Sequence, residues 1–136
     1  MEFIYEKQIL EHHLDTFGHV NNATYLALYE EARWDMTVCR GMTLETILER
    51  QKGPVVLEAK VRYKKEIKNR EHIKIITTHN VKRGQKLMRV EQRMEKSDGS
   101  VASTAEFLVG YMDLKERKLI TPDEAWYQAI GMGDAE

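Results

Sequence analysis

One long helical segment, followed by four alternating segments, constrains the fold of this chain more than any other feature. Between Asn22 and about Val38, apolar residues recur at the 3–4 spacing of one helix face: Tyr25, Leu28, Tyr29, Ala32 and Met36. Leu26 and Ala27 widen that face, so the first two turns are apolar nearly all round, as expected of a helix enclosed by other elements. A short second helix should follow, capped by Thr43 and stopped by Gly53-Pro54.

After this point the hydrophobic pattern alternates residue by residue, which is typical of β-strands. In residues 57–64, the less polar side chains share one face and the charged ones share the other: Leu57, Ala59, Val61 and Tyr63 against Glu58, Lys60, Arg62 and Lys64. Three more strands are predicted in residues 71–81, 86–95 and 101–111, and residues 3–12 form a first strand.

Short polar joints separate the later strands. KRGQ at 82–85 and SDGS at 97–100 are predicted hairpin turns, the second carrying an Asp-Gly pair. Residues 121–124 read as the start of a terminal helix, with Thr121 as its cap, a proline at the first helical position and a glutamate for the capping box.

This order of elements predicts an α+β fold. An antiparallel sheet with one apolar face must cover that face, and the long helix is the only element large enough to do so. The sheet should therefore have five strands wrapped around one central helix, which is the layout of the hotdog fold. With 136 residues, the chain is expected to form a single domain over 1–136.

Several protein classes are disfavoured by the composition. No apolar run approaches the ~18 residues needed to span a membrane. The first 13 residues mix acids with apolar residues, so they resemble neither a signal nor a transit peptide. Cys39 is the only cysteine, which excludes an intrachain disulfide, and we expect it to be buried as a small hydrophobe. A cytoplasmic location is the default expectation.

The net charge of −1 conceals an uneven distribution. Residues 1–35 hold two Lys/Arg against seven Asp/Glu, whereas residues 60–93 hold twelve Lys/Arg against three Asp/Glu. The basic stretch is either a set of solvated strand faces or a strip that binds a polyanion. Because no nucleic-acid motif or interleaved surface aromatics accompany it, we favour a small phosphorylated ligand and expect no nucleic-acid partner.

The run DTFGHVNNATYLALYEEAR (15–33) resembles the Asp-x-x-Gly-His-Val-Asn-Asn-x-x-Tyr segment, followed by Glu-x-Ala-Arg, of the 4-hydroxybenzoyl-CoA thioesterase-like acyl-CoA thioesterases. The predicted element order extends this likeness over nearly the whole chain. The resemblance implies a hotdog enzyme that hydrolyses an acyl-CoA or acyl-carrier-protein thioester without a cofactor. It also implies a homodimer or homotetramer with its site between subunits.

The resemblance assigns roles to residues at the start of the long helix. Asp15 matches the catalytic carboxylate, as nucleophile or general base, although a loop aspartate is more often a turn former. The backbone N–H of Asn22 matches the oxyanion-hole donor, a natural role for an unpaired group in a first helical turn. At least one of the two asparagines should cap the helix. Asn21 is also expected to set the geometry of the loop beside the substrate, and Tyr25 is a candidate to contact the substrate, with packing in the core as the alternative.

The clustered histidines near the N-terminus do not match a metal-binding pattern. Adjacent His12 and His13 on a strand would point to opposite faces, and their spacing with Asp15 and His19 matches no zinc motif, so no metal is predicted. His19 matches the histidine of the family motif and is expected to order the loop or line the site.

The basic stretch gains a purpose from the resemblance, because coenzyme A carries a 3′-phosphate and a pyrophosphate. Arg62, Lys64 and Lys65 are the candidate phosphate ligands. The family often has a proline at the end of this stretch, and here Glu66 takes its place. Two alternatives to the thioesterase stay open: a non-catalytic acyl-thioester-binding hotdog module, and a hotdog dehydratase or hydratase, for which no companion acid-base motif is found.

Overall fold

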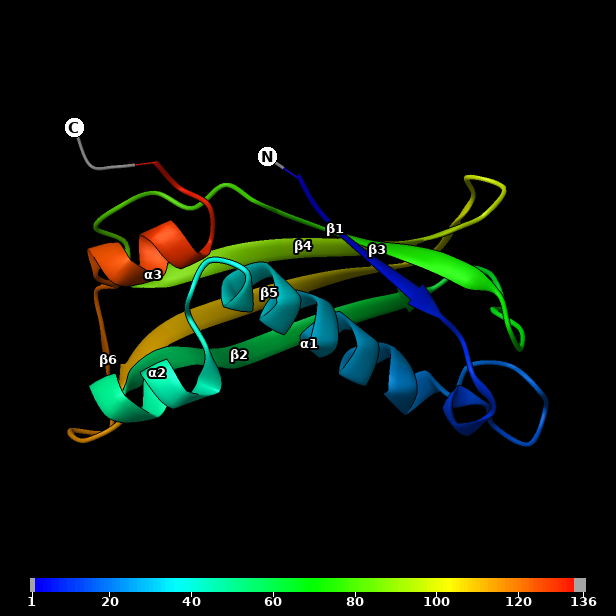
Figure 1. The fold of residues 1–136 in the computed structure, drawn as a ribbon, viewed down its shortest axis with the longest axis horizontal. Coiled ribbons are helices and arrows are strands. Elements are labelled where there is room, and N and C mark those ends of the chain that lie inside the picture. The colour runs from blue at the N-terminus through cyan, green and yellow to red at the C-terminus, as the bar shows by residue number, and fades with distance from the viewer. Residues whose placement is uncertain (1, 134–136) are drawn as a thin grey trace.

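The computed structural model describes residues 2–133 and has the predicted order of elements (Figure 1). These are β1 (Glu2–Gln8), a 3₁₀ turn (Glu11–His13), α1 (Asn22–Val38), α2 (Leu44–Arg50), β2 (Lys52–Tyr63), β3 (His72–His79), β4 (Leu87–Lys96), β5 (Val101–Asp113), β6 (Lys118–Ile120) and α3 (Glu124–Ala129).

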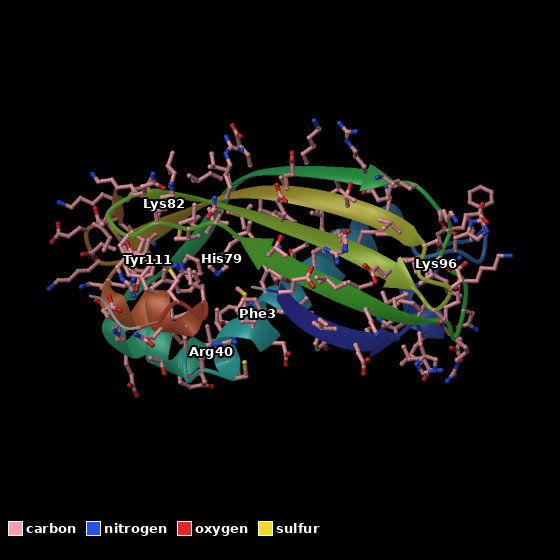
Figure 2. All side chains as sticks on the ribbon, turned by 90° about the horizontal axis from the view of Figure 1, so that it is seen from above. Phe3, Arg40, His79, Lys82, Lys96 and Tyr111 are labelled. Atoms are coloured by element: carbon pink, nitrogen blue, oxygen red, sulfur yellow. The ribbon has the colours of Figure 1, made fainter. Side chains whose placement is uncertain are left out.

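The strands form one antiparallel sheet in the order β1-β3-β4-β5-β2. The five expected strands are present, and a sixth short strand, β6, folds back on the end of β5. The three helices all lie on one side of the sheet, with α1 running across it (Figures 1 and 2). The α+β architecture with a sheet curved around one long helix is therefore confirmed, and β2 is left as an edge strand.

Helix α1 has the predicted bounds, and its predicted inner face is buried: Tyr25, Leu28, Tyr29, Ala32 and Met36. The enclosure of its first two turns was predicted wrongly, because Leu26 is 42% exposed and Ala27 is also exposed. The sheet of one chain covers only one side of the helix, so the apolar residues on the other side face outward.

The second helix begins as predicted, with the Thr43 hydroxyl accepting a hydrogen bond from the Thr46 backbone N–H at 3.2 Å. Its predicted end is wrong. The helix ends at Arg50, and Gln51 adopts the left-handed conformation with φ 55°. Gly53 then lies inside β2, where a Cβ atom would come within 2.8 Å of the Ile47 side chain. Close packing of the helix on the strand, rather than helix termination, is what requires this glycine.

The terminal helix starts two residues later than predicted. Asp123, not Thr121, is the N-cap, and its carboxylate accepts from the Trp126 backbone N–H at 3.1 Å. The same carboxylate forms an ion pair with Arg50 of α2. A charged acceptor is favoured at a helix N-terminus, and this one also ties α3 to α2, which a threonine at 121 would not do.

Two other local predictions differ from the structure. A register shift between Val56 and Glu58 interrupts the alternation of β2, and Leu57 is 42% exposed instead of sharing the inner face. Cys39 is exposed because it caps the C-terminus of α1, where the chain leaves the sheet. The SDGS turn is confirmed, with Gly99 at φ 85°. The KRGQ turn is part of a longer connection over residues 80–86.

A polar network crosses the core between α1 and the sheet. The Gln92 amide donates to the Tyr29 carbonyl at 3.0 Å and to the Thr77 hydroxyl at 2.9 Å. Its oxygen accepts from Arg33 Nη1 at 2.9 Å. The Tyr29 hydroxyl donates to Ser103 Oγ at 2.7 Å. These bonds join the middle of α1 to β3, β4 and β5, and so hold the helix in one position on the sheet.

At the end of α1 that lies far from Asn22, side chains from the two chain ends meet. Phe3 of β1 stacks on His79, with ring centroids 6.2 Å apart, and the Arg40 guanidinium carbon lies 4.2 Å from the Phe3 ring centroid (Figure 2). His79 in turn hydrogen-bonds the Ile130 carbonyl at 2.7 Å.

Among the described residues, no helix has the length and apolar character required to cross a membrane.

Candidate active site

The loop before α1 folds into a tight turn built around Asp15. Its Oδ1 atom accepts from the Phe17 backbone N–H at 2.8 Å and from that of His19 at 3.4 Å. The Asp15 backbone N–H donates to the His19 carbonyl at 2.8 Å. Gly18 has φ 81°, a conformation that side chains with a Cβ atom rarely adopt. The turn therefore fixes one carboxylate oxygen of Asp15 and holds the side chain beside the start of α1.

The first helical turn leaves one backbone donor free. Asn21 is the N-cap, as expected, and its side-chain oxygen accepts from the Ala23 backbone N–H at 2.9 Å. Within residues 2–133, the Asn22 backbone N–H donates to no acceptor. The cap accepts from the N–H of Ala23 and not from that of Asn22. The Asn22 N–H therefore stays available at the positive end of the helix dipole.

Two tyrosines flank this helix start. Tyr25 is 4% exposed and its ring meets that of Tyr63 edge to face, with centroids 4.9 Å apart. The Tyr63 hydroxyl donates to the Asn22 carbonyl at 3.0 Å. Burial raises the pKa of Tyr25 to about 12, and the Tyr63 hydroxyl and the nearby carboxylates of Glu71, Asp15 and Glu66 act in the same direction. The Tyr25 hydroxyl therefore stays protonated across the physiological pH range.

His19 connects the Asp15 turn to the segment after β2. Its Nε2 lies 3.1 Å from Glu66 Oε2. Two backbone contacts support this pairing: a β-bridge between His19 and Lys68, and a 2.9 Å bond from the Val20 N–H to the Ile67 carbonyl. A side-chain contact this exposed contributes little to stability, so the loop is held mainly by the backbone contacts.

These groups share one open cavity of about 300 Å³, lined by Asp15, His19, Val20, Asn22, Tyr25, Tyr63, Lys64, Lys65 and Glu66. Six of the eight predicted site residues are thus brought together. Asn21 caps the helix behind the cavity without lining it. The arrangement offers a carboxylate, a free backbone donor and two lysines around one space, which suits attack on a carbonyl in a ligand that also carries phosphates.

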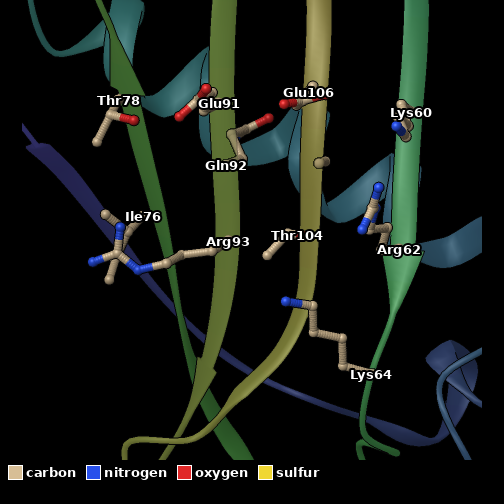
Figure 3. Close-up of a pocket in the computed structure, with 11 residues that line it drawn as sticks. Lys60, Arg62, Lys64, Ile76, Thr78, Glu91, Gln92, Arg93, Thr104 and Glu106 are labelled. Carbon is tan, nitrogen blue, oxygen red and sulfur yellow. The ribbon is translucent and has the colours of Figure 1, made fainter.

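Arg62 is the predicted residue that the structure separates from this cavity. It lies on the opposite face of the sheet, in a shallow depression of about 410 Å³ with Lys60, Arg93, Glu91 and Glu106. Figure 3 shows these side chains on the side of the strands turned away from α1. Lys64 lines both cavities. Alternation along β2 explains the split, because Arg62 points away from the helix and the chain turns only after Tyr63.

A third cavity, of about 330 Å³, lies beside the second half of α1 and is mostly apolar. Val55, Val56, Met88, Val109 and Trp126 are among its walls. Arg33 also lines it, with its guanidinium carbon 4.2 Å from the Phe107 ring centroid, and burial lowers the pKa of Arg33. The hydrogen bond from Arg33 to Gln92 places this arginine in the buried network between α1 and the sheet.

The first two histidines lie in the 3₁₀ turn rather than on a strand. Their rings are therefore close, with centroids 4.0 Å apart, instead of pointing to opposite faces. His13 is buried and its Nδ1 accepts from the Leu10 backbone N–H at 2.9 Å, while His12 is exposed. Within residues 2–133, no group of three His, Cys, Asp or Glu side chains is arranged to hold a metal ion.

Three residues that line the cavity were not predicted as site residues: Val20, Tyr63 and Glu66. Tyr63 had been placed only as an inner-face strand residue, and its position at the end of that face was the available signal. Glu66 was noticed only as a departure from the family pattern. Its contact with His19 joins positions 47 residues apart in the chain, and nothing local in the sequence indicates that contact.

Comparisons with known proteins agree with this architecture. The chain resembles a Staphylococcus aureus protein solved in complex with CoA, at 17% identity and a TM-score of 0.87, over 96% of this chain and 82% of that one. It resembles a DHNA-CoA thioesterase from the same organism at 21% identity and a TM-score of 0.82, over 94% and 87%. The probable thioesterase YbaW of Escherichia coli gives 23% identity and a TM-score of 0.79, over 94% and 96%. At these identities the likeness shows the hotdog fold alone.

No curated protein sequence matches the chain. The model of the thioesterase-like superfamily, in contrast, matches residues 10–130, which include the Asp15 turn, all of α1 and β2 to β5. A match of this extent, joined to the antiparallel sheet around one long helix, identifies the family: the chain belongs to the thioesterase-like superfamily.

Proposed function

We propose that the protein hydrolyses acyl-CoA thioesters, or acyl-carrier-protein thioesters, to the free acid and the thiol. One observation carries the proposal: Asp15 and Asn22, whose backbone N–H donates to no acceptor within residues 2–133, line the same cavity. Hydrolysis requires a nucleophile or base at the acyl carbon and a donor for the oxyanion, and these two groups meet that requirement. No cofactor is needed for this reaction.

The chemistry follows from these groups. As a general base, Asp15 takes a proton from a water molecule whose oxygen attacks the acyl carbon; the C–S bond breaks and the proton passes to the thiolate. As a nucleophile, the Asp15 carboxylate instead attacks the acyl carbon, and the C–S bond breaks to give an acyl anhydride and the thiolate. Water then cleaves the anhydride, which restores the Asp15 carboxylate and releases the acid, and a proton from that water passes to the thiolate. In both routes the Asn22 N–H stabilises the negative oxygen of the tetrahedral intermediate. His19 and Asn21 hold the turn and the helix start on either side.

The phosphates of CoA are assigned to the lysines at the mouth of the cavity. Lys64 and Lys65 line it, and their ammonium groups are suited to a flexible, solvated diphosphate. Arg62, on the outer face of the sheet, is a more distant contributor that a long ligand could reach only around the edge of β2.

We further propose that two copies of the chain pair through β2. This strand is an edge of the sheet, bonded only to β5, and it carries the exposed apolar side chains Val56 and Leu57. In an antiparallel pair centred near Glu58, the Tyr63 end of one strand lies beside the Pro54 end of its partner. The Asp15 cavity of one copy would then adjoin the apolar cavity of the other, which offers room for an acyl group.

One observation favours a second candidate, a hotdog module that binds thioesters without cleaving them. Asp15 Oδ1 accepts two backbone hydrogen bonds, as a purely turn-forming aspartate would. In that case the carboxylate would shape the loop and take no part in chemistry.

Asp15→Asn separates the two candidates. Asparagine keeps the turn, since its side-chain oxygen accepts the same bonds, but it removes the charge and the basicity. With thiol release measured over acyl-CoAs of graded length, the variant should hydrolyse at least about a hundredfold more slowly and still bind. The matched control is Asp113→Asn, because Asp113 accepts from the Lys115 and Glu116 N–H groups in a similar turn outside the cavity. Full turnover by Asp15→Asn would refute the mechanism, and wild-type binding without thiol release would favour the module.

A further inference from the structure

The hydroxyl of Tyr25 has no role in the packing of the core. Among the described residues it forms no hydrogen bond, although the residue is 4% exposed. The sole sealed side-chain nitrogen or oxygen without a partner in residues 2–133 is Arg50 Nη1. The Tyr25 hydroxyl is therefore not sealed, and its opening is the cavity that Tyr25 lines with Asp15 and Asn22.

Nothing in the core requires this hydroxyl, because a phenylalanine would fill the same space. The hydroxyl is open to solvent and is therefore free to bond water or a ligand in the cavity that Tyr25 lines. The neighbouring tyrosine of the same helix face shows the usual solution, because the Tyr29 hydroxyl donates to Ser103 Oγ at 2.7 Å. Tyr25, in contrast, has no hydrogen-bond partner within residues 2–133, and it lines the cavity.

The position of Tyr25 in α1 brings this hydroxyl to the correct side of the helix. Side chains in an α-helix lean toward its N-terminus, so the Tyr25 ring covers the turn that begins at Asn22. The contact with Tyr63 agrees, since the Tyr63 ring meets Tyr25 while its hydroxyl bonds the Asn22 carbonyl. Tyr25 and Asn22, three residues apart on α1, thus line the same cavity.

We propose that the Tyr25 hydroxyl is a second hydrogen-bond donor to the thioester carbonyl oxygen, completing with the Asn22 N–H a two-donor oxyanion hole. This inference rests on the proposed function and deepens it. The phenol donates a hydrogen bond and transfers no proton: water still supplies the oxygen of the acid, the C–S bond still breaks, and Asp15 still acts as the base or the nucleophile. Its raised pKa keeps the phenol in the donor form.

The first test is Tyr25→Phe, assayed by thiol release from acyl-CoA. Loss of one oxyanion donor should lower kcat by at least about tenfold, toward the ~10²–10³-fold cost known for such donors, with little change in KM. The melting temperature should stay nearly the same, because the hydroxyl that is removed has no hydrogen-bond partner within residues 2–133. The control Tyr29→Phe, one turn along the helix, should lose stability by orphaning Ser103 but keep its kcat. An unchanged kcat in Tyr25→Phe would overturn the proposal, as would a fall in kcat accompanied by a loss of stability like that of Tyr29→Phe.

A second test does not depend on turnover. Calorimetry compares a stable ketone analogue of acyl-CoA, in which a methylene replaces the sulfur, with an S-alkyl thioether of CoA that lacks the carbonyl. Tyr25→Phe should weaken binding of the ketone about threefold to tenfold and leave the thioether unaffected, as expected for one hydrogen bond. Equal effects on both ligands would overturn the proposal. If the wild-type protein binds the ketone through Tyr25 but releases no thiol from any acyl-CoA, the proposed hydrolase function is refuted, whereas the proposed hydrogen bond from Tyr25 is supported.

Discussion

Replacement of Gln92 by leucine tests how α1, and with it the candidate site, is held on the sheet. Gln92 is 3% exposed and makes three side-chain hydrogen bonds: to the Tyr29 carbonyl, to the Thr77 hydroxyl, and from the Arg33 guanidinium. Leucine has nearly the same size but can make none of them. Arg33 would then be left against the Phe107 ring without its hydrogen-bond acceptor.

The expected loss follows from the kinds of bond involved. The bond from the charged Arg33 is worth about 1.5–3 kcal/mol and each of the other two about 0.5–1.5 kcal/mol. The extra apolar burial of leucine returns about 1–2 kcal/mol. The net loss is therefore about 3 kcal/mol, a large part of the ~5–15 kcal/mol that stabilises a typical domain. In a domain of this length such a loss lowers Tm by roughly 10 °C.

Urea unfolding followed by tryptophan fluorescence measures this loss, since Trp34 and Trp126 both pack against the core. Thr77→Val, which removes one neutral bond, should cost about 1 kcal/mol. The control is Glu91→Leu, the adjacent residue on the exposed outer face, which should change stability by no more than about 0.5 kcal/mol. If Gln92→Leu were no less stable than Glu91→Leu, the buried network would not hold the helix and the reasoning would be refuted.

Two further predictions concern assembly and pH. Val56→Asp, on the β2 edge, should convert the proposed dimer to a monomer in analytical ultracentrifugation, whereas Leu48→Asp, at a more exposed apolar position on α2, should not; a dimeric Val56→Asp protein would place the interface elsewhere. Burial lowers the pKa values of His13 and His79 below their ordinary value, so the unfolded chain binds more protons than the folded one as the pH falls. Stability should thus be greatest above about pH 6.5 and decline toward pH 5, and His13→Gln with His79→Gln should flatten this decline in thermal melts. An unchanged decline in the double variant would contradict this assignment.

The sequence alone determined the elements and much of the helix start. The bounds of α1 and the caps at Asn21 and Thr43 follow from periodicity and from side chains two or three residues from the groups they bond. Such interactions depend on local geometry, which is nearly the same in any fold. The family motif likewise selected Asp15 and Asn22, because all of its residues lie within one short segment.

Other features were decided only by the tertiary structure, because they depend on which distant residues meet. Tyr63 and Glu66 join the cavity through contacts with Asn22 and His19, more than 40 positions away in the chain. Asp123, which forms an ion pair with Arg50, caps the last helix in place of the predicted Thr121. Arg62 lies outside the cavity because it is on the opposite face of the sheet. The free hydroxyl of Tyr25 and the bonded one of Tyr29 have the same local sequence signal. Only the packing of α1 against β2 and β5 gives one hydroxyl a partner in the core and opens the other to the cavity.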